Sequence, residues 1–186
     1  IGKECFSGTS NLKSIEFSNV GQISLFSQSF KNSTDLQNIS FSKSSEVGIE
    51  NDCFGDTKLR FISFSEVNKI KLSPQTYMSC KTLESIAVQN TKELIIGKEC
   101  FKDSHQLKSI AFITDSIFLG DRFINGCNSL EFFKLQTKFG EITIFRDTFQ
   151  NTKLKGILLD APKIKLCSEC FKGIGTLESL EIIGNA

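Results

Sequence analysis

One short motif recurs along this chain at a nearly constant interval. Leu-x-x-Ile-x-Phe, or a variant with another apolar residue in its second or third place, occurs eight times among the 186 residues. Its last residues are Phe17, Phe41, Phe64, Val88, Phe112, Leu135, Leu159 and Ile182, so successive copies lie 23 or 24 residues apart. We call this motif the first block. A period of this length is typical of a repeat protein and decides the fold more strongly than any other feature.

A second apolar pair, the second block, lies between consecutive first blocks. Its members are Ile23 and Leu25, Val47 and Ile49, Ile70 and Leu72, Leu94 and Ile96, Ile117 and Leu119, Ile142 and Ile144, and Ile164 and Leu166. Seven residues after the first member of each pair comes a large apolar residue, in turn Phe30, Phe54, Tyr77, Phe101, Ile124, Phe149 and Phe171. Constant spacing inside the blocks, with variable links between them, is typical of stacked strands joined by surface loops.

Both blocks alternate apolar and polar residues and are rich in Ile, Phe, Val and Leu, a pattern that predicts strands with one buried face. Each block is too short for an ordinary helix. One repeat, or coil, cannot bury its own apolar face, so we expect the coils to stack at about 4.8 Å. The sequence therefore predicts a mainly β, leucine-rich-repeat solenoid of about eight coils of 23 or 24 residues. It should have two parallel β ladders and a single domain over residues 1–186. Short helical turns should lie near the column of mostly aromatic residues that follows the second blocks, which we call the aromatic column.

The repeat resembles the BspA-like, or Treponema-type, class of leucine-rich repeats over the whole chain. The resemblance rests on the order Phe, five residues, first block, second block and Cys-Phe, with Cys80 and Cys127 three residues before a Leu. Two features depart from related patterns. The Asn or Cys ladder of common leucine-rich repeats is missing, and Ser18, Ser42 and Ser65 stand where the BspA-like pattern often has Pro. Abundant Phe, Ile, Lys, Asn and Ser without Trp resembles proteins from AT-rich genomes, such as those of protists in which this family is expanded.

Composition narrows the classes of partner. Lysine and arginine number 22 and aspartate and glutamate 21, so a net charge of +1 does not favour a nucleic acid or an anionic membrane as partner. No apolar run approaches the length of a membrane-spanning helix, so we expect no membrane insertion in this segment. The chain starts inside a second block without Met, which indicates a fragment of a longer repeat protein. Uncapped coils would also allow end-to-end association.

The seven cysteines do not predict a disulfide framework. Cys5, Cys53, Cys100 and Cys170 share one column of the repeat, and no two of them lie in adjacent coils. Two coils span about 9 to 10 Å, more than a disulfide allows between Cα atoms. We therefore expect at least five free thiols, with Cys167 and Cys170 as the only pair that could be oxidised. A lone C-x-x-C is weak evidence for zinc, and small side chains at a strand-to-turn position explain it better.

Catalytic groups are not evident. The single His105 lies in a variable link, and the chain has no Gly-rich phosphate loop or Gly-x-Ser-x-Gly elbow. We therefore predict that the protein is not an enzyme and needs no cofactor or metal. Charges after each Leu form a structural pattern instead, because from Arg60 onward each faces the opposite sign one coil away. That column reads Lys13, Gln37, Arg60, Glu84, Lys108, Glu131, Lys155 and Glu178. Opposite pairs of this kind favour the correct register of the stack.

The outward face of the first-block sheet is the candidate ligand-binding surface. Most of its side chains are small, whereas parallel sheets usually have both faces covered. Phe61 and Phe132 interrupt this pattern, and aromatic residues are enriched where interfaces concentrate their energy. The alternative is that the two rings only pack on neighbouring side chains. The candidate residues are Phe61, Phe132, Ser63, Ser85, Ser109 and Lys134.

Two functions are consistent with these features. The resemblance implies a binding module of a surface or secreted adhesin that recognises a protein or a glycan. Two sequons, which begin at Asn32 and Asn38, agree with passage through a secretory pathway, although free cysteines favour a reducing compartment. The alternative is an intracellular, cytoplasmic scaffold that acts as a rigid spacer in a larger assembly.

Overall fold

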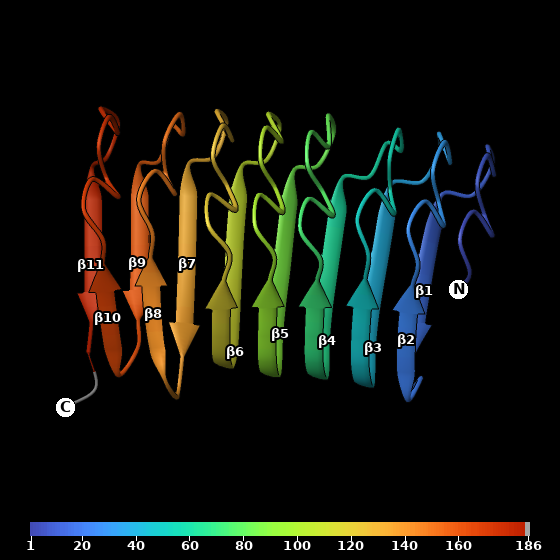
Figure 1. The fold of residues 1–186 in the computed structure, drawn as a ribbon, viewed down its shortest axis with the longest axis horizontal. Helices are drawn as coiled ribbons and strands as arrows, with labels where there is room; N and C mark the ends of the chain where they lie inside the picture. Colours follow the sequence, from blue (N-terminus) through green and yellow to red (C-terminus); the bar gives the residue numbers. More distant parts are fainter. Residues whose placement is uncertain (185–186) are drawn as a thin grey trace.

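The computed structural model describes residues 1–184, which form one β-solenoid. The strands lie side by side along a rod, with β1 near one end and β11 at the other (Figure 1). Each coil runs along one strand segment, bends, returns along a second segment and closes through a set of turns at the other edge. The repeat period therefore corresponds to one complete turn of the chain.

The strands begin and end close to the predicted blocks. Their bounds are β1 (Ser14–Ser18), β2 (Gln22–Leu25), β3 (Asn38–Ile49), β4 (Phe61–Leu72), β5 (Ser85–Ile96), β6 (Ser109–Leu119), β7 (Phe132–Thr137), β8 (Glu141–Ile144), β9 (Gly156–Asp160), β10 (Lys163–Leu166) and β11 (Ser179–Ile183). The first blocks pair in the order β1-β3-β4-β5-β6-β7-β9-β11, and β2 pairs with β3. Strands β8 and β10 form a separate two-stranded sheet. The predicted mainly β solenoid is confirmed.

All strand pairs within the described chain are parallel, and equivalent residues of successive coils face one another. Ile39 pairs with Ile62 and Phe41 with Phe64, and the same register continues through the second blocks of β3 and β4. This in-register pairing is what a constant spacing inside each block requires. It places every column of the sequence repeat as a row along the rod.

The two blocks are less separate than the sequence suggested. In β3, β4, β5 and β6 both blocks belong to one continuous strand of 11 or 12 residues, bent at the link. Lys43, Glu66 and Asn90 adopt φ values of 49°, 56° and 53° at this bend. A single left-handed residue turns the chain while its neighbours stay extended. The ladder therefore continues around the corner.

In two later coils the strand is interrupted at the same place. Between β7 and β8 the link contains Gly140, whose φ of 84° is left-handed, and Phe139, which is exposed. Between β9 and β10 lies Pro162, which has no backbone N–H to donate to a ladder. The split therefore has a local cause in each coil.

The predicted helical turns are absent from residues 1–184, where no helix forms. Each coil instead has two left-handed positions four residues apart. The first position holds Glu4, Gln28, Asp52, Gln75, Glu99, Arg122, Asp147 and Glu169, and the second holds Gly8, Asn32, Asp56, Ser79, Asp103, Gly126, Asn151 and Gly173. Left-handed residues at this spacing leave no room for a continuous helical turn. The second position is rich in Gly, Asn and Asp, the residues that tolerate this conformation best.

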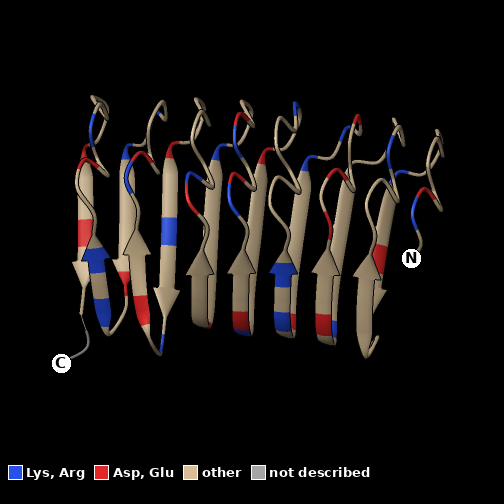
Figure 2. Ribbon diagram, viewed as in Figure 1, with Lys and Arg blue, Asp and Glu red and all other residues tan. Residues whose placement is uncertain are grey.

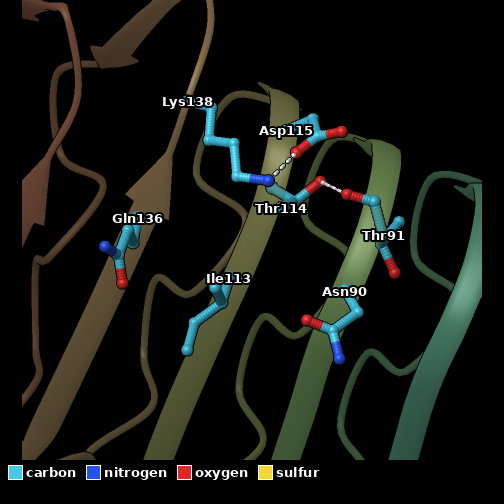
Figure 3. A pocket seen from close by; sticks show the side chains of 7 residues that line it. All are labelled: Asn90, Thr91, Ile113, Thr114, Asp115, Gln136 and Lys138. Atoms are coloured by element: carbon cyan, nitrogen blue, oxygen red, sulfur yellow. Dashed lines mark hydrogen bonds and ion pairs between the residues drawn. The ribbon is translucent and has the colours of Figure 1, made fainter.

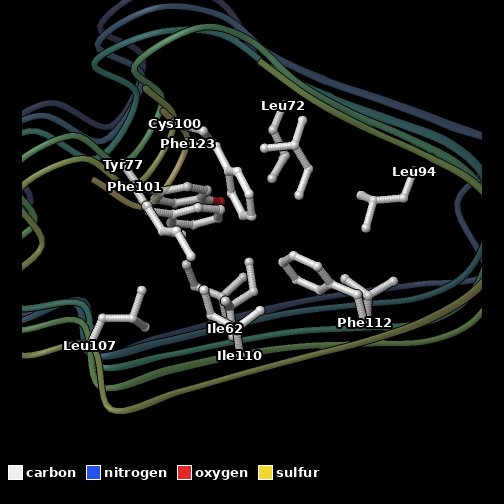
Figure 4. Packing of buried hydrophobic residues seen from close by; sticks show 14 of the residues in the cluster. Ile62, Leu72, Tyr77, Leu94, Cys100, Phe101, Leu107, Ile110, Phe112 and Phe123 are labelled. Atoms are coloured by element: carbon white, nitrogen blue, oxygen red, sulfur yellow. The ribbon is translucent and has the colours of Figure 1, made fainter. Parts of the chain in front are cut away.

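The core lies between the two strand segments of each coil and is closed by the aromatic column (Figure 4). Phe54 and Phe101 are 1% and 0% exposed. The rings of Phe6, Phe30, Phe54, Tyr77 and Phe101 form one continuous stack, with successive centroids 5.2 to 5.6 Å apart. This stack of side chains therefore runs through five successive coils.

Cysteine side chains fill buried positions beside this column. All seven cysteines are free, and Cys53, Cys100 and Cys127 are completely buried. Burial raises the pKa of Cys53 and of Cys127 to about 12. Cys167 and Cys170 both carry free thiols, with the amide of Cys170 donating to the carbonyl of Cys167 at 3.3 Å. The thiol count in solution remains a prediction.

Candidate binding face

The first-block face is the outward surface of the strand segments built from the first blocks. One of its two rows runs through Ser14, Asn38, Phe61, Ser85, Ser109, Phe132, Gly156 and Ser179. The other row runs through Glu16, Ser40, Ser63, Ala87, Ala111, Lys134, Leu158 and Glu181. All six candidate residues from the sequence therefore lie on one face.

Phe61 stands at one side of this face with 42% of its surface exposed. The guanidinium carbon of Arg60 lies 5.1 Å from the centre of its ring, which is a cation–π distance. The Nε of Arg60 also donates to Oε1 of Glu84 at 2.6 Å. The contact with Glu84 thus fixes the guanidinium beside the ring of Phe61, while much of the ring stays in solvent.

Phe132 lies three coils further along and is 56% exposed. Its ring leans over Gly156 of the next strand, so a Cβ at position 156 would lie 3.3 Å from Cδ1 of Phe132. Ser85 and Ser109 separate the two aromatic residues in the row. The two rings therefore rise from a surface of small side chains about 14 Å apart.

The second row of the face also consists mostly of small side chains in its middle part. Ser63 is exposed, and Ala87 and Ala111 beside it are partly exposed. Lys134, the one cation of this row, is half-buried next to Ala111 and Leu158. No other strand of residues 1–184 packs over this side of the sheet. The face is open to a partner along its length.

A ladder of charges runs along the edge of the face, at the start of the first-block strands. Nζ of Lys108 lies 3.0 Å from Oε2 of Glu84, and Nζ of Lys155 lies 2.9 Å from Oε2 of Glu131. Signs alternate between coils along this edge (Figure 2). Lys108, followed by Arg60, holds the pKa of Glu84 below its usual value. The predicted ladder forms around Glu84 and between Glu131 and Lys155. Among residues 1–184, no ion pair joins Lys108 to Glu131 or Lys155 to Glu178, so the ladder is incomplete at these two steps.

The second-block face differs because its charges are mostly paired with one another. Lys69 contacts Glu93 at 2.8 Å and Lys163 contacts Glu141 at 2.7 Å, in both cases one coil away. Paired surface charges of this kind are already satisfied within the chain. The first-block face is therefore the better candidate for contact with another molecule.

A small hollow lies at the bend between β5, β6 and β7 (Figure 3). Its volume is about 80 Å³, and Asn90, Ile113, Asp115, Gln136 and Lys138 are among its lining residues. Nζ of Lys138 lies 3.1 Å from Oδ1 of Asp115 and closes one side. A space of this size has room for only a few water molecules and is too small for a substrate.

His105 has a structural contact in place of a catalytic one. Its Nδ1 lies 3.0 Å from the carbonyl oxygen of Gly126, in the next coil. Among residues 1–184, no group of three His, Cys, Asp or Glu side chains is placed to hold a metal ion. None of the secondary structure in that range is a helix long and apolar enough to cross a membrane.

The two sequons occupy different places in the coil. Asn32 is exposed at a turn, in a left-handed conformation with a φ of 59°. Asn38 is exposed at the first position of β3, in the row next to Phe61. A glycan on Asn32 would project from the turn edge, whereas one on Asn38 would cover part of the first-block face.

Two signals were missed at the level of sequence. The position of Arg60 over Phe61 depends on a side-chain rotamer, which column patterns do not contain. Gly156 was grouped with the other small residues of its row, although it is the only glycine there. A glycine inside a strand often marks a close approach of another group, and this signal could have singled it out.

Comparison with known proteins identifies the repeat. The family described as BspA type leucine-rich repeat region matches residues 1–131 and residues 70–186, with six copies of the repeat. Searches of curated proteins and of solved structures found no match. The matched segments together span the whole chain, and the solenoid geometry agrees with them. The chain belongs to the BspA-type leucine-rich repeat family.

Proposed function

We propose that this chain is a non-catalytic module that binds a protein partner through the first-block face. The observation that carries the proposal is the pair of exposed rings, Phe61 and Phe132. They lie on a sheet face that otherwise has mostly small side chains and that no other strand of residues 1–184 covers. Solvent-exposed aromatic side chains on a surface of small residues offer a partner close approach and large contact area. Ser63, Ser85, Ser109 and Lys134 lie between or beside them and would supply polar contacts.

Membership of a leucine-rich repeat family supports a binding role, because stacked repeats create extended surfaces for partners. We further propose that the module belongs to a surface or secreted adhesin. Exposure of Asn32 at a turn supports this part, since a sequon must be accessible to be glycosylated. Expression through a eukaryotic secretory pathway, followed by mass measurement before and after removal of N-glycans, tests whether Asn32 accepts a glycan.

The binding proposal is tested by selecting displayed random peptides against immobilised protein. We expect enriched peptides to lose binding to a Phe61→Ser/Phe132→Ser double variant, with each substitution weakening the interaction by more than about 1 kcal/mol. Glu16→Gln, on the same face but near the first coil, is the control that should leave binding intact. Peptides that bind the double variant as well as the unsubstituted protein would contradict the proposal. A parallel glycan array on the same two proteins would show whether a sugar ligand replaces the peptide.

A further inference from the structure

A shallow hollow on the first-block face is formed where the repeat departs from its pattern. Its volume is about 260 Å³, and Phe132, Gly156, Leu158, Ser179 and Glu181 are among the residues that line it. Gly156 forms the floor because it has no side chain, and the exposed ring of Phe132 forms a wall. In the row of Gly156, every other residue carries a side chain that would fill this space.

The backbone does not require glycine at position 156. Its φ lies outside the left-handed region, where glycine is needed, and it sits at the first position of β9. Glycine weakens a strand and is found where another group approaches the backbone closely. An alanine Cβ would lie 3.3 Å both from Cδ1 of Phe132 and from Oγ of Ser179. The glycine therefore keeps open a space that a side chain would close.

Charges at the two sides of the hollow indicate what could enter it. Lys134 and Glu181 flank Leu158 in the second row, one on the strand before it and one on the strand after it. Neither side chain forms an ion pair within residues 1–184, and two strand spacings, about 9.6 Å, keep them from pairing directly. The hollow is thus an apolar space between a free cation and a free anion.

From this arrangement we propose that the hollow binds an apolar side chain of an extended protein segment that has an acidic residue on one side and a basic residue on the other. In an extended segment, residues i, i+2 and i+4 point to the same side and span about 13 Å. The side chains of Lys134 and Glu181 are long enough to meet charges at that spacing. This inference rests on the proposed function, because it specifies the partner of the same face.

The experiment uses three labelled heptapeptides, Gly-Asp-Ser-Leu-Ser-Lys-Gly, the same peptide with Ser in place of Leu, and Gly-Lys-Ser-Leu-Ser-Lys-Gly. Each is titrated into ¹⁵N-labelled protein while amide shifts are recorded. We expect the Asp/Leu/Lys peptide to shift the amides of Gly156 and Ser179 most, and to bind at least about 5-fold more tightly than the Ser peptide. Such a ratio equals about 1 kcal/mol, a typical value for one buried apolar side chain.

Variants locate the contact and separate it from effects on folding. Gly156→Val should fill the hollow and reduce affinity for the Asp/Leu/Lys peptide at least about 5-fold. Ser14→Val, at the equivalent position of the first coil in the same row and far from the hollow, is the matched control and should not change it. Lys134→Glu leaves an anion on both sides, so it should reverse the preference in favour of the Lys/Leu/Lys peptide. A reversal of preference is a gain of binding that misfolding cannot produce.

Two results overturn this inference. Equal binding of the Leu and Ser peptides, or largest shifts away from Gly156 and Ser179, would show that the hollow does not take an apolar side chain. If the Lys134→Glu variant still prefers the Asp/Leu/Lys peptide, the flanking charges do not determine which peptide binds. Displayed peptides that still depend on Phe61 would leave the proposed function of the face intact in either case.

Discussion

The regular coils from Phe30 to Phe101 differ from the coils that follow them. In the first region the rings of the aromatic column are nearly parallel, with interplanar angles of 9° or less. In the next coil Ile124 replaces the aromatic residue, and Phe123 occupies the preceding position, where other coils have Cys, Ser or Thr. Phe133 then meets Phe123 at 54° and Phe149 at 72°.

The difference extends from the core to the surface. The regular region has continuous bent strands, whereas the later region has split strands at Gly140 and Pro162. It also carries the exposed rings of Phe132 and Phe139 and the hollow above Gly156. The comparison indicates that repetition of the core column provides stability, while departures from the repeat create surface features that a partner can recognise.

The largest expected effect is in the regular stack. Phe54→Ala should lower the free energy of unfolding by about 3 to 5 kcal/mol, because it leaves a cavity between Phe30 and Tyr77. Phe6→Ala is the control, since Phe6 is 37% exposed and stacks on one ring only, and it should cost clearly less. Urea unfolding of both variants measures the difference. Equal losses would mean that the stack does not concentrate stability in the middle coils.

A substitution at the break in the stack tests its cause. Ile124→Phe should destabilise the protein by about 1 to 3 kcal/mol, because Phe123 and Ile124 are both fully buried and the space is already filled. The double variant Phe123→Cys/Ile124→Phe restores the Cys-Phe pair of other coils and should recover most of the loss. Urea unfolding of the single and double variants decides this. A single variant more stable than the unsubstituted protein would show that Phe123 does not impose the break.

One substitution in the regular stack should increase the stability of the protein. The hydroxyl of Tyr77 is buried and has no hydrogen-bond partner among residues 1–184. Tyr77→Phe removes this unsatisfied group and keeps the ring between Phe54 and Phe101, so it should stabilise the protein by about 1 to 2 kcal/mol. A rise in the midpoint of urea unfolding would confirm the contact pattern. A fall would mean that the hydroxyl finds a partner in solution.

The smallest expected effect is a difference in alkylation rate between two buried thiols, one in each region. Cys53 lies in the regular region and Cys127 in the irregular one, and burial raises the pKa of each to about 12. At pH 8 both should react with an alkylating reagent far more slowly than exposed Cys5. Between the two, Cys127 should react faster, because the broken stack beside it opens more easily. Mass spectrometry of modified peptides over time measures the three rates, and faster modification of Cys53 would reverse the comparison.

Much of the fold could be predicted because the repeat determines register. Once the first blocks are aligned, Phe61, Ser85, Ser109 and Phe132 must fall in one row, and the structure places them so. The continuous strands could not be predicted in this way. Three of them, β3, β4 and β5, contain one left-handed residue in the link, such as Lys43, and this conformation is a property of the stacked coils rather than of lysine.

The site was only partly predictable for a related reason. Column analysis identifies which residues face outward, so it found the two exposed rings. It does not show the direction of a ring within its row, and the hollow exists because Phe132 leans over Gly156. The turns were also misjudged, since a left-handed residue in each turn excludes the helix that their length allows.

The most direct test of the central claim is the free energy of unfolding of the Phe61→Ser/Phe132→Ser double variant, measured by urea. The claim is that these rings serve recognition, while the core column provides stability. We predict a loss below about 1 kcal/mol, within the range of surface substitutions and far below that of Phe54→Ala. A loss of about 3 kcal/mol or more would contradict the claim and would make the two outward rings part of the structure that holds the coils together.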